Sequence, residues 1–355
     1  MQHKILSKDS LAEFIEALRK DYTVYAPKRD KKVPNKMVWK VLEADETPTF
    51  EFVNTDMSPK DFVFPQSECM MRFKAEGKDA MVLKPVEQDT EQRVLLNVRP
   101  CDGKGLSFMD MIFCQDEQTN DVYWRDKRER TVMIGLACNS PCPSCFCLEA
   151  NCGPHHEVGL DILMVDLGVQ LLLKPLTERG KAIAASLPDA SAADVKAAQT
   201  KRQQAEAAMK KTIDTQHVEQ RSLMELYNLP YWERVCETCI NCGTCTFVCP
   251  TCHCFDIQDE VPASGGNGRR VRNWDFCMAP LFTLHTSGHN PRGKKIARVR
   301  QRFMHKYKYI PMKRGGEVGC VGCGRCVRLC PVNIDIRDVI NAMNAPDTAT
   351  EGQEV

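Results

Sequence analysis

The chain has 355 residues, 43% of them hydrophobic and 27% charged, which is long enough and apolar enough for two ordinary domains. Its 48 Lys and Arg residues against 47 Asp and Glu residues argue against a global electrostatic attraction to nucleic acid or to an anionic membrane. No apolar stretch approaches the roughly 18 residues of a membrane span, and the first residues lack a secretory core, so we expect a cytoplasmic protein without a membrane span.

Residues 1–175 carry the patterns of a mixed α+β domain. Apolar residues at helical spacing follow Ser10, and Ser10 with Glu13 predicts a capping box at the start of a helix. Alternating apolar runs bounded by turn residues predict strands at 22–26, 37–42, 50–53, 80–83, 93–99, 131–137, 161–165 and 169–173, the last two as a hairpin. Two of these strands end directly before a cysteine region, at Cys101 and at Cys138.

Residues 176–230 are rich in Ala, Lys, Gln and Glu, which predicts a helical connector. Ser191 and Asp194 predict the cap of a helix that runs to about residue 213, and a second helix precedes Pro230. A cysteine-rich domain follows at 231–345, with a basic helical insert at 292–308. The polar tail at 346–355 is expected to be disordered.

The chain contains 20 cysteines, which is the most informative feature of its composition. Disulfide scaffolds are typical of short secreted chains, whereas thiols at this density in a reducing compartment usually bind metal. Twelve cysteines lie between Cys236 and Cys330, and seven more lie between Cys101 and Cys152. Both clusters are therefore candidate metal sites.

The bacterial ferredoxin pattern Cys-x2-Cys-x2-Cys-x3-Cys-Pro occurs twice in the C-terminal domain. Three closely spaced cysteines wrap a loop around an iron–sulfur cube, and the fourth binds the other cluster in two-cluster proteins. We therefore predict two [4Fe-4S] clusters in a bacterial-type dicluster ferredoxin domain. Their predicted ligands are Cys239, Cys242, Cys245 and Cys330 for cluster 1, and Cys320, Cys323, Cys326 and Cys249 for cluster 2.

Two other chemistries fit parts of these runs. Zinc knuckles also use Cys-x2-Cys, but two complete four-cysteine runs that each end in Cys-Pro favour clusters. Cys249-x2-Cys252-His253 has the form of a c-type haem attachment motif. Haem attachment would require export, and Cys249 is already assigned to a cluster.

The N-terminal cysteines leave three interpretations open. Cys138-x3-Cys142-x2-Cys145 has the spacing of radical S-adenosylmethionine enzymes, although Ser144 stands where those enzymes carry an aromatic residue and no series of βα units follows. Alternatively, strand-end and loop thiols hold a third [4Fe-4S] cluster, or Cys101 and Cys138 are buried structural thiols. The candidate ligands of the third cluster are Cys101, Cys138, Cys145 and Cys147.

The remaining cysteines have weaker assignments. Cys252, Cys254 and Cys277 pack as core thiols or contribute to a further metal site. We expect structural roles for Cys69, Cys114, Cys142, Cys152 and Cys236, with Cys142 as the first exception.

Two further features of the sequence are a basic stretch and the absence of a nucleotide-binding motif. Residues 292–314 hold ten Lys and Arg residues and no acid, which predicts a solvated helix face or a docking surface for an acidic partner, with nucleic acid as the alternative. No strand–G-x-G-x-x-G–helix unit and no P-loop is present, so another protein would have to deliver the electrons.

Several motifs together resemble a known family. The resemblance is to the β subunit of cytosolic sulfhydrogenases, the A subunit of anaerobic sulfite reductase, and the iron–sulfur subunit of flavin oxidoreductases that feed heterodisulfide-reductase-type complexes. It extends over roughly residues 10–343. The motifs that carry it are Arg99-Pro100-Cys101-Asp102, Asp121-Val122-Tyr123-Trp124, Cys145-Phe146-Cys147, Cys249-Pro250-Thr251-Cys252-His253-Cys254, Arg272-Asn273-Trp274-Asp275-Phe276-Cys277, Gly288-His289-Asn290-Pro291-Arg292 and His305-Lys306.

The resemblance implies a mixed N-terminal domain before a dicluster ferredoxin domain, and it favours the third cluster because Cys101, Cys138, Cys145 and Cys147 match. It further implies an electron-transfer subunit of anaerobic metabolism within a hetero-oligomer. Its partners would be a flavin- and NAD(P)H-binding subunit and a hydrogenase, sulfite reductase or heterodisulfide-reductase-type subunit. We therefore expect a relay without a catalytic site of its own. The competing classes are a radical S-adenosylmethionine enzyme with auxiliary clusters and a cluster protein that binds nucleic acid.

Overall fold

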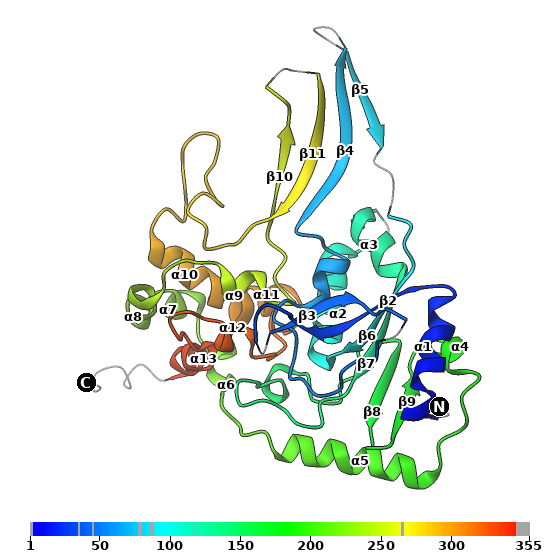
Figure 1. Ribbon diagram of the computed structural model, residues 1–355. Coiled ribbons are helices and arrows are strands. Elements are labelled where there is room, and N and C mark those ends of the chain that lie inside the picture. Colours follow the sequence, from blue (N-terminus) through cyan, green and yellow to red (C-terminus); the bar gives the residue numbers. More distant parts are fainter. Residues whose placement is uncertain are drawn as a thin grey trace.

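A computed structural model describes residues 3–34, 36–44, 46–76, 80–85, 89–116, 118–263 and 266–345 (Figure 1). The tail at 346–355, which the sequence predicts to be disordered, lies outside the described residues.

Within these residues seven strands form one sheet in the order β1-β9-β8-β7-β6-β2-β3. The inner strands β2, β6, β7 and β8 run parallel, while β1, β9 and β3 pair antiparallel at the two edges. The sheet is therefore open, not closed into a barrel. Its strands are β1 (Lys4–Ser7), β2 (Thr23–Arg29), β3 (Met37–Val41), β6 (Arg93–Val98), β7 (Thr131–Leu136), β8 (Ile162–Asp166) and β9 (Gln170–Pro175).

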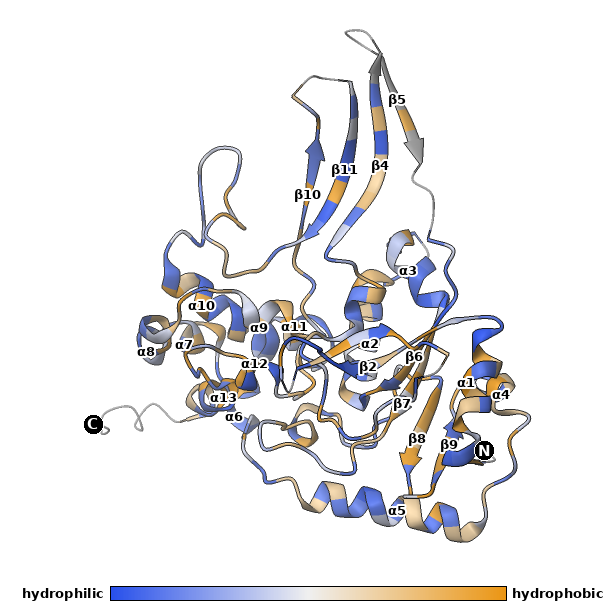
Figure 2. Cartoon of the chain, in the orientation of Figure 1, coloured by the Kyte–Doolittle hydropathy of each residue, from blue (hydrophilic) through white to orange (hydrophobic). Residues whose placement is uncertain are grey.

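Helices cover both faces of this sheet, which explains why every residue of β6 and β7 is buried. One face packs against α1 (Leu11–Arg19) and α4 (Glu178–Ala184), and the other against α2 (Pro100–Phe113), α3 (Val122–Glu129) and α5 (Ala192–Ala207). Figure 2 shows the hydrophobic character of β8 and β9 against the mostly hydrophilic β10. The connection from β6 through α2 and α3 to β7 places Cys101 and Cys138 at the same edge of the sheet.

Most elements predicted for this region are confirmed, with several differences. The helix α1 exists, but in the described chain Ser10 makes no side-chain capping bond, because a short 3-10 turn, η1 (Lys8–Ser10), leads into it. Residues 50–53 form no strand. Instead they carry backbone carbonyls that accept hydrogen bonds from Arg99, as at Val53 O (2.8 Å). The 14-residue helix α2 after β6 was not predicted.

Four further strands of the described chain form a second, antiparallel sheet that projects from the body (Figure 1). It combines two hairpins that are distant in sequence, because β11 pairs with β4 along most of its length. Arg272 on β11 forms a buried ion pair with Glu68 on the neighbouring β4 (2.5 Å), and its second ion pair, with Asp121 just before α3, links this sheet to the body. The strands are β4 (Ser67–Glu76), β5 (Ala80–Pro85), β10 (Phe255–Glu260) and β11 (Asn267–Trp274).

The C-terminal part is helical and has its own core around Trp232, Phe303 and Met343. The predicted capping box of Ser191 and Asp194 is present at the start of α5, which ends at Ala207, earlier than expected. No helix of the described residues is long and apolar enough to cross a membrane. The remaining helices are α6 (Gln216–Gln220), α7 (Leu223–Tyr227), α8 (Tyr231–Thr238), α9 (Thr244–Phe247), α10 (Lys295–Met304), the π-helical η4 (His305–Tyr309), α11 (Ile310–Lys313), α12 (Arg325–Arg328), α13 (Ile336–Asn344), and the 3-10 turns η2 (Pro59–Phe62) and η3 (Leu148–Ala150).

A fully buried ion pair joins the two cysteine regions. Asp102, on α2, accepts two hydrogen bonds from Arg325 on α12, at 2.6 and 2.8 Å, and the two residues are at most 1% exposed. Arg325 also donates to the carbonyl oxygen of Thr55 at 2.7 Å. Asp102 is therefore the counter-ion of the buried guanidinium.

Replacement of Asp102 by Ala is expected to lower the free energy of unfolding by about 3–5 kcal/mol, because it leaves the charge of Arg325 buried without a counter-ion. The measurement is the urea midpoint followed by circular dichroism under anaerobic conditions. Asp259→Ala breaks a solvent-exposed pair with Arg270 and should shift the midpoint far less. Equal shifts in the two variants would contradict this account.

Candidate metal centres

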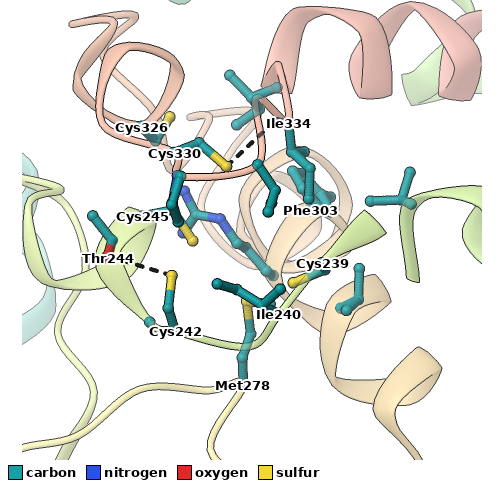
Figure 3. A pocket seen from close by; sticks show the side chains of 17 residues that line it. Cys239, Ile240, Cys242, Thr244, Cys245, Met278, Phe303, Cys326, Cys330 and Ile334 are labelled. Carbon is teal, nitrogen blue, oxygen red and sulfur yellow. Dashed lines mark hydrogen bonds between the residues drawn. The ribbon is translucent and has the colours of Figure 1, made fainter. Parts of the chain in front are cut away.

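Thiols of both ferredoxin runs line one cavity between α8, α9 and the loop after α12 (Figure 3). We call it the first thiol cavity. Its other walls are mainly apolar, with Ile240, Phe303 and Ile334 around the sulfur atoms. Its thiols are those of Cys239, Cys242, Cys245, Cys326 and Cys330. The four residues predicted for cluster 1 thus lie together, and Cys326 joins them.

The backbone of this cavity is arranged around the sulfur atoms. Gly243 adopts a φ of 75° at the start of α9, a left-handed conformation that glycine tolerates best. The backbone N–H of Ile334 donates to Cys330 Sγ at 3.2 Å, and the N–H of Asn241 donates to Cys239 Sγ at 3.4 Å. Such hydrogen bonds to ligand sulfur stabilise its negative charge. Cys242 is exposed, so this cavity reaches the surface.

The four residues predicted for cluster 2, which we call the second thiol set, also interact with one another. Cys249, Cys320 and Cys323 are at most 9% exposed, and Cys326 is partly buried. Burial raises the pKa of Cys323 to about 11, opposed by the charge of Arg325 and reinforced by that of Cys249. Crowded, desolvated thiols of this kind bind a metal with release of protons, because the metal replaces the mutual repulsion by attraction.

Two buried cations lie among these thiols. Lys306 Nζ is 3.5 Å from Cys249 Sγ, and it also donates to Thr251 Oγ1 (2.9 Å) and to the carbonyl oxygen of Gly319 (2.7 Å). A hydrogen bond from Cys252, together with the charges of Lys306 and Arg302, holds the pKa of Cys249 well below its usual value despite burial. The site therefore favours a thiolate at Cys249.

A third group of thiols lines a separate cavity at the edge of the seven-stranded sheet, which we call the third thiol cavity. Burial raises the pKa of Cys101 and of Cys138. Cys142 Sγ and Cys145 Sγ are 2.7 Å apart, and the hydrogen bond from Cys145 lowers the pKa of Cys142 to about 5. The thiols that line this cavity are those of Cys101, Cys138, Cys142, Cys145, Cys147 and Cys323.

The third thiol cavity touches the second thiol set directly. Cys323 belongs to both, and the N–H of Phe146 donates to the carbonyl oxygen of Gly322 at 2.9 Å. Glycine is required at this contact, because a Cβ on Gly322 would lie 2.4 Å from Phe146 O and one on Gly324 would lie 2.6 Å from Ser144 O. The Cys142–Cys147 loop is thus packed onto the Cys320–Cys326 loop.

Apart from Cys142, the cysteines with weaker assignments line neither the first nor the third thiol cavity. Cys252, Cys254 and Cys277 line neither cavity, but a hydrogen bond between Cys254 and Cys277 lowers the pKa of the former and raises that of the latter. Cys114 and Cys236 line neither cavity, and their structural roles stay predictions. Cys142 is the exception that the sequence allowed.

The thiols surround cavities and do not converge on one point. Among the described residues, no three His, Cys, Asp or Glu side chains are placed to hold a metal ion. An iron–sulfur cube is larger than an ion and is bound at its corners by thiolates spread around it. The linings of the first and third thiol cavities, thiols set among mainly apolar atoms, provide the donor atoms that such a group requires.

The basic stretch is the clearest departure from the sequence prediction. The sequence predicts a solvated helix face or a docking surface, but four of the ten cations, Arg298, Arg302, Lys306 and Lys308, are at most 7% exposed. Arg298 and Lys308 donate to backbone carbonyls, for instance to Gly293 O (2.6 Å) and Arg221 O (2.6 Å). Charge count alone could not separate these internal roles from a surface role.

Comparisons with known proteins agree with this arrangement. Residues 238–334 match the family model of the 4Fe-4S dicluster domain, so the C-terminal part is a dicluster ferredoxin domain with two [4Fe-4S] clusters. The chain is therefore an iron–sulfur protein. It is similar to sulfhydrogenase 2 subunit beta of Pyrococcus furiosus, with 26% identity over 94% of this chain and 96% of that protein. The predicted resemblance and the α+β fold class are confirmed. No solved structure matches the chain significantly.

Proposed function

We propose that the chain relays electrons through three [4Fe-4S] clusters between two other subunits. The proposed ligands of clusters 1 and 2 are the crossed sets predicted from the ferredoxin runs. For the third cluster we propose Cys101, Cys138, Cys145 and Cys147, with Cys142 as the alternative to one of them. Backbone N–H groups hold the sulfur atoms of Cys239 and Cys330 in place, so an electron can enter and leave with little rearrangement.

The observation that carries this proposal is the continuity of the three sites. The third thiol cavity shares Cys323 with the second thiol set, and the first thiol cavity shares Cys326 with it. This row of three sites reaches the surface at the first thiol cavity, where Cys242 is exposed and Ile240 is 59% exposed. A continuous row of thiol sites that ends at an exposed edge suits a relay, because a partner can exchange electrons there.

The partners are proposed from the relative. A protein named sulfhydrogenase 2 subunit beta matches over nearly the whole of both chains, which supports a place in a sulfhydrogenase-type complex. We propose a flavin- and NAD(P)H-binding subunit on one side. On the other side we propose a hydrogenase subunit, with a sulfite reductase or heterodisulfide-reductase-type subunit as the alternatives.

The test is to purify the native complex through a tag on this chain, without oxygen, and to identify its subunits by mass spectrometry. We expect a flavin-containing subunit to copurify and NAD(P)H to bleach the cluster absorbance. Full cluster occupancy with no copurifying flavoprotein and no response to NAD(P)H would contradict the proposed relay.

The two competing classes are disfavoured by particular observations. Cys138, Cys142 and Cys145 do line one cavity, but they sit on an open sheet with antiparallel edges instead of a barrel of βα units. A nucleic-acid surface on residues 292–308 is disfavoured because Arg298, Arg302, Lys306 and Lys308 are buried. The relay therefore accounts for the site best.

A further inference from the structure

In the described part of the dicluster domain, two buried cations, Arg302 and Lys306, lie next to thiols and not next to carboxylates. Arg302 is 3% exposed and Lys306 is 4% exposed, and neither forms an ion pair with a carboxylate of the described residues. A buried charge without a counter-ion is strongly unfavourable, so each of these cations requires a negative group nearby. The thiol groups around them are the available anions.

The two cations lie at different places relative to the two predicted cluster sites. Arg302 lines the first thiol cavity, and its charge acts on Cys245 of cluster 1 and on Cys326 of cluster 2. Lys306 Nζ lies 3.5 Å from Cys249 Sγ, and its charge acts also on Cys252 and Cys320, so the predicted ligands nearest to it belong to cluster 2. Arg302 thus faces ligands of both sites, whereas Lys306 lies beside those of cluster 2.

The helix that carries them is built to present them inward. Arg302 is on α10, and Lys306 follows in the π-helical turn η4 (His305–Tyr309). Turns of this type occur mostly as single insertions in helices, often at functional sites. In η4 the Lys306 ammonium points to the thiols, while Lys308, two residues later, donates to the carbonyls of Val218 (3.1 Å), Glu219 (2.9 Å) and Arg221 (2.6 Å). Lys308 is therefore a matched buried lysine that does not contact the thiols.

We propose that Lys306 raises the reduction potential of cluster 2 and that Arg302 raises the potentials of both clusters. A fixed positive charge next to a cluster favours the reduced state, which carries one more negative charge. Because Lys306 contacts a predicted ligand of cluster 2, it raises the potential of that cluster more than that of cluster 1 and makes the two potentials unequal. This inference rests on the proposed relay and adds to it that these two side chains set the order in which the clusters fill with electrons.

The experiment is a redox titration of the anaerobically purified full chain, followed by EPR, for the wild type and for Lys306→Gln, Lys306→Arg and Lys308→Gln. At the wild-type midpoint of cluster 2, the ratio of reduced to oxidised cluster should fall at least tenfold in Lys306→Gln, a downward shift of about 59 mV for one electron. Lys306→Arg keeps the charge and should stay near the wild type, as should Lys308→Gln. In Arg302→Gln the signals of both clusters should shift downward.

Iron content is measured for each variant, so that failure of the relay and failure of this inference are distinguishable. A wild-type chain without iron would overturn the relay itself. Full iron content with an unchanged potential in Lys306→Gln, or an equal shift in Lys308→Gln, would overturn the role of Lys306. Loss of iron from both Lys306→Gln and Lys306→Arg would overturn it as well, since it would assign this residue to retention of the cluster.

Discussion

Replacement of Cys245 by Ser should remove cluster 1, so that the iron content falls by about four atoms per chain and electron flow through the complex stops. Cys245 is on α9 and lines the first thiol cavity with three other proposed ligands. A serine hydroxyl is a much poorer ligand for iron than a thiolate, because the soft thiolate is the preferred donor for such clusters. The measurement is iron and acid-labile sulfide per chain, together with NAD(P)H-dependent dye reduction by the purified complex.

The matched control is Cys236→Ser. Cys236 is a partly buried thiol on the adjacent helix α8, and it does not line the cavity. This variant should keep its iron and its electron flow. Equal loss of iron from both variants, or normal electron flow in Cys245→Ser, would be incompatible with the proposed path through cluster 1.

Replacement of Cys138 by Ser should remove the third cluster and leave the other two in place. The iron content would fall from about twelve to about eight atoms per chain. We expect this loss because Cys138 follows β7 at the edge of the sheet and lines the third thiol cavity with the other proposed ligands. The EPR spectrum of the reduced chain should lose one of three signals, and NAD(P)H-dependent electron flow should fall strongly.

Cys114→Ser is the control for this experiment. Cys114 follows α2 in the same N-terminal region, is partly buried, and lies outside the cavity. It should leave all three signals unchanged. A wild-type chain with only about eight irons, unchanged by Cys138→Ser, would make the N-terminal cysteines structural and limit the relay to two clusters.

Most of the candidate site could be predicted from the local spacing of cysteines. The runs around Cys245 and Cys326 predicted crossed sets of ligands, and the structure brings the thiols of Cys239, Cys242, Cys245 and Cys330 to one cavity. This worked because three ligands of each set lie within seven residues, so chain geometry alone brings them together. The fold class followed in the same way from strands such as 131–137, whose apolar runs are long and continuous.

Features that depend on distant contacts were not predictable. The pairing of β4 with β11 joins segments about 200 residues apart. The residues of neither strand indicate which other strand it pairs with. The contact of Phe146 with Gly322 places the third thiol cavity against the second thiol set, but the spacing of cysteines holds no information about it. Only the tertiary structure shows that Cys323 belongs to both groups.

The basic stretch shows how composition can mislead. Ten cations without an acid usually form a solvated surface, yet Lys306 is buried here because its charge has thiols and carbonyl oxygens as partners. Similarly, the sequence shows Asp102 only as part of a motif, whereas its buried pair with Arg325 connects α2 to the dicluster domain. Both cases concern charges whose counter-ions lie far away in the sequence.

The central claim is that these thiols hold iron–sulfur clusters. It is tested most directly by iron and sulfide analysis with EPR of the dithionite-reduced, anaerobically purified full chain. Our account predicts a brown protein with about twelve irons and twelve sulfides per chain, and three interacting [4Fe-4S] signals. A colourless protein without iron, or one that holds zinc in their place, would contradict it.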